Sequence, residues 1–275
     1  MADRYEWKPE DMPTTPFPLM DHCILLGKRG SEAHGTYVPP TEPTSLDDRD
    51  LMGICIPPVD YYYGLKQWDG ADAIKGPWDT VLYPLQKFMR LLIRQNPNVL
   101  CMLWLEAEDY HLKTPEGEHL IANRDMFRSK KAAYEAIVGY ARHQLHRMTH
   151  IAVTGEGTHR LGAKRKALVE AFGYDTKNAA HMVRLLLMGQ EYLRTGHLQV
   201  RRTGDREMIL EIKRGEWPRL NVELYATKLF AGCDNAYEYS VLPEQCDEAK
   251  INELAVNLTQ SWMTRLRHKK EFGGR

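Results

Sequence analysis

The sequence predicts an α+β protein, in which a mixed sheet with flanking helices over residues 1–125 is followed by an all-α part over residues 126–275. The first half contains short apolar runs that end at Gly or Pro, which is typical of buried strands. From about residue 128, apolar side chains recur at helical spacing almost to the C-terminal end. A chain of 275 residues is long enough to form two modest hydrophobic cores, one for each half.

Two strands are predicted near the N-terminal end of the chain. The apolar run at residues 23–26 ends at Gly27 and delivers the chain to Gly30-Ser31. A second apolar run, at residues 51–56, ends at two prolines. We expect both runs to be buried strands, and the proline-containing stretch between residues 38 and 45 to be a loop.

A helix and a third strand are expected next. Between residues 81 and 93 the apolar side chains recur at helical spacing, which predicts an amphipathic helix. Asn96-Pro97 end this helix, because the residue before a proline disfavours helical geometry. The apolar run at residues 99–105 then predicts a central strand of the sheet.

The second half is predicted to contain only helices. Asp175 can cap the N-terminus of one of them, and Gly196 can end it. The predicted helices lie near residues 129–148, 162–172, 176–195, 218–231 and 244–266.

Composition excludes several classes of protein. The 37 Lys and Arg balance the 37 Asp and Glu, so any nucleic-acid site must be local. No apolar run approaches the roughly 18–20 residues that span a bilayer, and the polar N-terminus does not resemble a signal peptide. The five cysteines include no CxxC pair. We therefore expect a cytoplasmic protein with reduced thiols and no membrane partner.

One segment carries the residue types of phosphate and metal chemistry. Gly30-Ser31 at a helix start can bring backbone N–H groups and a hydroxyl close to phosphate oxygens. Asp48 and Asp50 are two residues apart at the edge of a strand, so their side chains point to the same side. Their hard oxygens suit Mg²⁺, or Mn²⁺ in its place. The segment predicts a site for a metal-bound nucleoside triphosphate.

These motifs resemble a known superfamily. The pattern G-S-x-A-x-G, followed by a D-x-D strand, Gly and Pro-Pro, is similar to the nucleotidyltransferase core of the DNA-polymerase-beta superfamily. The stretches at residues 96–100, 162–186 and 200–217 resemble its RNA-repair-pathway nucleotidyltransferases, which are found in bacteria and phages. The resemblance spans roughly residues 22–232. It implies a polymerase-beta-like palm, a helical partner domain, Mg²⁺ and a nucleoside triphosphate donor.

The resemblance also assigns roles to particular residues. It implies that Gly30 and Ser31 bind phosphates and that Asp48 and Asp50 are the catalytic metal carboxylates. The pattern departs at Cys101, because relatives tend to have Glu after Asn-Pro-Asn-x-Leu. Two-metal phosphoryl transfer usually requires a third carboxylate. Glu106 is a substitute by proximity, but in a regular strand it would face opposite to Cys101. We expect Cys101→Glu to raise activity if the third ligand belongs at this position.

A second constellation is expected on the helix that Asp175 caps. Lys177, His181 and Arg184 are spaced at i, i+4 and i+7, so they share one face of that helix. This face can contact the nucleotide across a cleft between the two domains. The competing interpretation is a solvated or salt-bridged helix face.

The function expected from these residues is the transfer of an NMP from a nucleoside triphosphate to an acceptor hydroxyl. Basic clusters at residues 164–166, 201–202 and 265–270 favour an RNA acceptor, such as a tRNA-like end, held through its phosphates. One alternative is a catalytically impaired nucleotide- or RNA-binding protein of the same fold. Another is a nucleotidyltransferase that modifies protein side chains. The donor base and the oligomeric state stay open.

Overall fold

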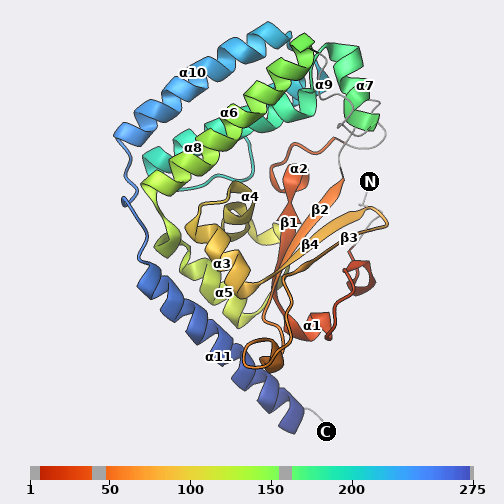
Figure 1. Ribbon diagram of the computed structural model, residues 1–275, viewed down its shortest axis with the longest axis vertical. Coiled ribbons are helices and arrows are strands. Elements are labelled where there is room, and N and C mark those ends of the chain that lie inside the picture. Colours follow the sequence, from red (N-terminus) through yellow and green to blue (C-terminus); the bar gives the residue numbers. More distant parts are fainter. Residues whose placement is uncertain (1–6, 39–47, 155–162, 273–275) are drawn as a thin grey trace.

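The first half of the chain folds around a mixed five-stranded sheet (Figure 1). The structure is a computed structural model that describes residues 7–38, 48–154 and 163–272; most of the predicted loop at 38–45 lies outside these ranges. The strand order is β3-β4-β2-β1-β5, with β2 and β4 parallel and the other neighbours antiparallel. The strands are β1 Cys23–Arg29, β2 Arg49–Cys55, β3 Ala71–Lys75, β4 Trp78–Pro84 and β5 Tyr110–Lys113. The predicted fold class is confirmed, as are its first two strands.

The predicted helix over residues 81–93 is only partly correct. Helix α3, Leu85–Ile93, begins after Pro84, and the residues before it form β4. Along β4, Trp78, Thr80 and Leu82 are buried while the residues between them are partly exposed, which is the alternation of a strand. Val81 and Leu82 fit helical spacing by chance, because a strand and a helix that adjoin both place apolar side chains toward one core.

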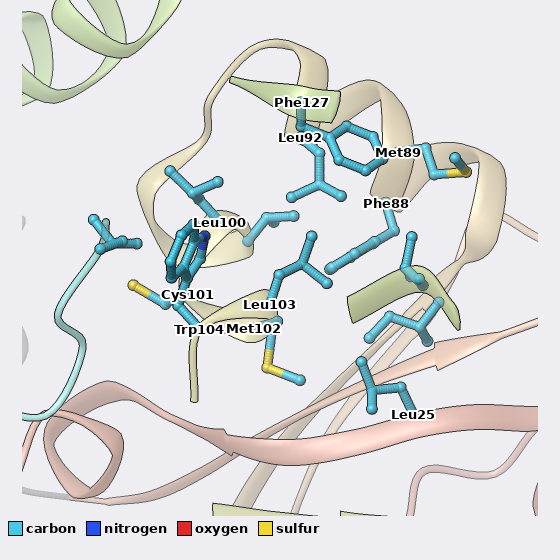
Figure 2. Packing of buried hydrophobic residues seen from close by; sticks show 14 of the residues in the cluster. Leu25, Phe88, Met89, Leu92, Leu100, Cys101, Met102, Leu103, Trp104 and Phe127 are labelled. Carbon is cyan, nitrogen blue, oxygen red and sulfur yellow. The ribbon is translucent and has the colours of Figure 1, made fainter. Parts of the chain in front are cut away.

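The predicted central strand over residues 99–105 is wrong. Residues Pro97–Leu100 form the short helix α4, and Cys101–Leu103 continue it as a 3₁₀ turn. The Asn96 side chain accepts hydrogen bonds from the backbone N–H groups of Asn98, at 3.1 Å, and Val99, at 3.3 Å. This cap and Pro97 at the first helical position start a helix. Figure 2 shows the segment packed against Phe88 and Leu92, so its apolar character reflects burial rather than strand geometry.

Helices form the rest of the structure. Asp175 caps α8 by accepting from the backbone N–H of Asn178 at 2.9 Å, and Gly196 ends it with φ of 71°, as predicted. The sequence pattern did not predict the helix α9, Arg206–Arg214, which precedes α10, Arg219–Glu238. The remaining helices are α1 Leu19–His22, α2 Gly30–Ala33, α5 Pro115–Ala122, α6 Lys130–Thr154, α7 Ala163–Phe172, α8 Thr176–Thr195, α9 Arg206–Arg214, α10 Arg219–Glu238 and α11 Glu248–Phe272.

The helices belong to two layers. Helices α6, α8, α9 and α10 pack on one another around their own apolar cluster, and Figure 1 shows them above the end of the sheet at which α2 lies. Helix α11 returns along α3 and α5, and its residues Ile251, Leu258 and Trp262 share a core cluster with the sheet and α4. Within the described residues, no helix combines the length and apolar character needed to cross a bilayer. The two layers meet where β1 ends and β2 begins.

Candidate active site

A cavity of about 350 Å³ lies where the sheet meets α8. It brings together residues that are far apart in the sequence, including six of the seven predicted site residues. These six are Gly30, Ser31, Asp50, Lys177, His181 and Arg184. The seventh, Asp48, is exposed just before β2 and does not line the cavity, although its charge acts on Asp50.

The turn from β1 into α2 forms one edge of the cavity. Gly30 has φ of 63°, a conformation that L side chains rarely adopt. A Cβ atom built on Gly30 would also collide with the Asp50 carboxylate. Glycine is therefore required at this position by its backbone conformation and by the close approach of β2, and Ser31 follows it at the cavity wall.

Two aspartates and one arginine lie next to one another on three neighbouring strands beside this turn. Arg29 is opposite Asp50 in the pairing of β1 with β2, and Asp50 is opposite Asp79 in the pairing of β2 with β4. The Arg29 Nη2 atom lies 3.2 Å from Asp50 Oδ1 and 3.2 Å from Asp79 Oδ1. Burial raises the pKa of Asp50 to about 6, Arg29 opposes this shift and Asp79 adds to it. We call these three residues the acidic row.

The acidic row fits a divalent cation. Mg²⁺ is commonly held by one or two carboxylates, with water and substrate phosphates completing its shell. Asp50 and Asp79 supply two such carboxylates at the cavity wall, and burial raises the pKa of Asp50 although Arg29 opposes the shift. Across the described part of the chain, no three His, Cys, Asp or Glu side chains are arranged to hold a metal by themselves. The ligand would have to complete the site.

Helix α8 forms the opposite, cationic wall. Lys177 lowers the pKa of Asp50 through its charge, so the two walls influence each other across the cavity. Arg184 is only 5% exposed, and burial lowers its pKa to about 10. Its guanidinium donates to His181 Nδ1 at 3.4 Å and to the Met188 sulfur at 3.1 Å. Neither acceptor is an anion.

His181 is held by Arg184 in one tautomer. Because the guanidinium can only donate, His181 Nδ1 accepts and the proton of the neutral ring is on Nε2. This Nε2 is buried and has no hydrogen-bond partner among the residues that the structure describes. Burial and the charge of Arg184 lower the pKa of His181 well below its usual value, so the ring is neutral. The wall therefore presents an unsatisfied N–H donor next to a buried cation.

The model of the RNA repair pathway DNA polymerase beta family matches residues 21–213 of the chain. The chain belongs to this family. It is therefore related to the nucleotidyltransferases of the DNA-polymerase-beta superfamily. No curated protein matches the sequence significantly.

A likeness to solved structures adds little. The crystal structure of a nucleotidyltransferase-like protein from Exiguobacterium sibiricum 255-15 is 10% identical in sequence and is aligned over 79% of this chain and 69% of that chain. The TM-score of 0.29 is too low to support conclusions about the site.

The cavity of this family member is also lined by residues that the sequence pattern did not single out, among them His34, Lys213 and Asp79. His34 Nδ1 donates to the Val200 carbonyl at 3.0 Å, and burial with the charge of Arg184 lowers its pKa well below the usual value. Lys213 of α9 donates to the Thr36 carbonyl at 2.8 Å. Only the G-S-x-A-x-G motif, which contains His34, gave a signal in sequence for any of these three.

The structure places Cys101 at the cavity and Glu106 outside it. Cys101 lines the cavity from the 3₁₀ turn after α4, and Arg184 is the charged side chain that acts on its pKa. Glu106 is exposed and does not line the cavity. A carboxylate beside Asp50 is instead supplied by Asp79 on the neighbouring parallel strand.

Each of the three basic clusters contains cations that pair with carboxylates of the chain. Arg201 binds both oxygens of Asp109 at 2.7 Å, and the buried Arg202 binds Glu191 and Asp205. Further ion pairs join Arg165 to Asp175, Arg265 to Glu116 and Lys269 to Asp21. These cations stabilise contacts between segments, so their presence in the sequence is weak support for RNA binding.

Proposed function

We propose that this protein transfers an NMP from a nucleoside triphosphate to an acceptor hydroxyl, with a divalent metal ion as cofactor. The observation that carries the proposal is the pairing of two unlike walls around one cavity. The acidic row faces a helix that presents a buried guanidinium and an unsatisfied imidazole N–H. A metal-bound triphosphate has the complementary charges, because its cation suits the carboxylates and its phosphates suit the donors.

Asp50 and Asp79 would hold the metal, with Asp48 close enough to influence Asp50. When bound, Mg²⁺ or Mn²⁺ neutralises phosphate charge and activates the attacking hydroxyl. The backbone of the chain itself positions the phosphates. Gly30 allows the backbone to approach the phosphates, and its lack of a side chain leaves room for the Asp50 carboxylate.

Arg184, His181 and Lys177 would bind the phosphate oxygens from the other side. Among the described residues, the hydrogen-bond partners of Arg184 are both neutral. An incoming phosphate would be its first anionic partner. The His181 Nε2–H would gain its missing acceptor. Both contacts strengthen as negative charge moves to the leaving pyrophosphate, which is the condition for lowering the barrier.

An RNA end is the acceptor that the family favours, since the model that matches is that of an RNA repair pathway family. The alternative of a catalytically impaired binding protein was based on Cys101. Asp79 weakens the reason for that alternative, because it provides a carboxylate beside Asp50. A protein acceptor is the remaining alternative.

The experiment is a labelling assay. The protein would be incubated with Mg²⁺, each α-³²P-labelled nucleoside triphosphate, and either total RNA or a total protein lysate. We expect ribonuclease-sensitive label from one or more donors, absent with Asp50→Asn. Protease-sensitive label would contradict the RNA acceptor, and triphosphate binding without any transfer would contradict the proposed activity.

A further inference from the structure

The cavity contains a buried positive charge that the described residues do not neutralise. Arg184 is 5% exposed and lines the cavity. Its hydrogen bonds go to a thioether sulfur and an imidazole nitrogen, and no ion pair joins it to a carboxylate of residues 7–38, 48–154 or 163–272. The other arginine that is buried among the described residues, Arg202, differs because it has two carboxylate partners. A buried guanidinium without a counter-ion is costly, so a ligand anion is its natural partner.

Cys101 is the neighbour that leaves this charge uncompensated. It is 6% exposed and lines the same cavity, and its sulfur points away from Phe88 and Leu103 in Figure 2. Burial raises the pKa of the thiol to about 11, although Arg184 opposes the shift. The side chain is therefore neutral at physiological pH. It fills space beside Arg184 without supplying a negative charge.

We propose that position 101 sets the affinity of the cavity for polyphosphate, because a neutral Cys101 keeps the Arg184 guanidinium available to an anionic ligand. This inference rests on the proposed function, in which that ligand is a triphosphate. A carboxylate at position 101 would give Arg184 an internal partner. The ligand would then have to break this buried pair before it could bind.

The structure therefore reverses the expectation for Cys101→Glu. If position 101 were a metal position, the variant would gain activity. If it faces Arg184, the variant loses affinity for the phosphates. The neutral Cys101→Gln variant has nearly the same size as Cys101→Glu, so it separates the effect of charge from the effect of volume.

The test uses inorganic tripolyphosphate as the probe, which makes the unknown donor base irrelevant. Dissociation constants would be measured by calorimetry with Mg²⁺ for the full-length wild type, Cys101→Glu, Cys101→Gln, Arg184→Gln and the double variant Cys101→Glu/Arg184→Gln. We expect Cys101→Glu and Arg184→Gln each to weaken binding about 10- to 100-fold, which is the effect of one charged hydrogen-bonding group. Cys101→Gln should stay within about three-fold of wild type.

The double variant decides the mechanism. If Glu at position 101 acts by pairing with Arg184, it has little further effect once Arg184 is replaced, so the two losses are not additive. Additive losses, or an equal loss in Cys101→Gln, would overturn the inference. Wild-type affinity in Arg184→Gln would overturn it even if Cys101→Glu fails to fold, and so would a wild type that does not bind tripolyphosphate.

Failure of this inference and failure of the proposed function can be told apart. A protein that binds tripolyphosphate with the expected pattern but transfers no nucleotide would retain the role of position 101 and lose the proposed activity. A protein that labels RNA but is insensitive to Cys101→Glu in tripolyphosphate binding would retain the activity and lose this role.

Discussion

The two walls of the cavity balance their charges differently. On the sheet, Arg29 lies between Asp50 and Asp79 and contacts both at 3.2 Å, so the acidic row already contains a cation. On α8, Arg184 has only neutral partners among the described residues. The sheet wall can form without a ligand, whereas the helix wall has a deficit of negative charge.

This difference indicates what each wall contributes to binding. A metal ion that enters the acidic row must compete with Arg29, so free metal is expected to bind weakly. A phosphate that reaches Arg184 meets no competing carboxylate among the described residues. We therefore expect the triphosphate to be essential for tight metal binding.

The largest effect is expected from Asp50→Asn. Asp50 contacts Arg29, influences the space beside Gly30 and lies in the centre of the acidic row. Its replacement should lower the nucleotidyl transfer rate by roughly a thousand-fold or more, because several kcal/mol of metal-dependent stabilisation are lost. Transfer of label to the acceptor measures the effect. Asp72→Asn on the exposed edge of β3 is the matched control, and equal losses in both variants would contradict the assignment.

Asp79→Asn should have the next largest effect. If Asp79 supplies the further carboxylate, its replacement lowers the transfer rate by on the order of a hundred-fold, while Glu106→Gln changes it little. Rates measured on the same acceptor would compare the two variants. Full activity in Asp79→Asn together with a loss in Glu106→Gln would contradict this assignment and favour Glu106 as the further carboxylate.

The sequence was sufficient where the information is local. Gly30-Ser31 and Asp50 follow from two short motifs, and the shared face of Lys177, His181 and Arg184 follows from helical spacing after the Asp175 cap. Each inference needed only a few consecutive turns or strand residues. The structure then placed these segments around one cavity, which spacing alone does not determine.

Asp79 could not be predicted in the same way. Its role depends on the pairing of β4 with β2. The spacing of apolar residues from 81 onward predicts a helix, which hides the second half of β4. The alternation along Trp78, Thr80 and Leu82 was a signal for a strand, but it does not give the neighbour or the register. The wrong prediction of a strand over residues 99–105 has a similar cause, because a short buried apolar run fits a strand and a helix equally well.

Arg29→Gln should sharpen the comparison through metal binding. Removing the cation between Asp50 and Asp79 should raise the affinity for free Mn²⁺ roughly ten-fold, since a positive charge a few ångströms away no longer opposes the metal. Calorimetry without nucleotide measures this constant. Arg49→Gln removes an adjacent positive charge that pairs with Glu32, so it serves as the control. Unchanged or weaker Mn²⁺ binding in Arg29→Gln would show that Arg29 does not compete with the metal.

The smallest effect concerns stability against acid. The pKa of His34 is lowered by burial, so the unfolded chain binds more protons than the folded chain below the usual value of about 6.5. Stability should therefore fall as the pH decreases from 7 to 5, by at most about 1.4 kcal/mol per pH unit for this group. Denaturant unfolding should show a weaker pH dependence in His34→Asn, and no such change in His119→Asn on the surface. Parallel profiles for wild type and His34→Asn would contradict this expectation.

The most direct test of the central claim is calorimetric titration of each nucleoside triphosphate, with and without Mg²⁺, into the wild type and the Asp50→Asn/Asp79→Asn variant. If the acidic row holds the metal of a bound triphosphate, at least one nucleotide binds to the wild type in a metal-dependent manner, and the variant loses the metal dependence. Binding that is equally metal-dependent in the variant, or the absence of binding for every triphosphate, would contradict the account.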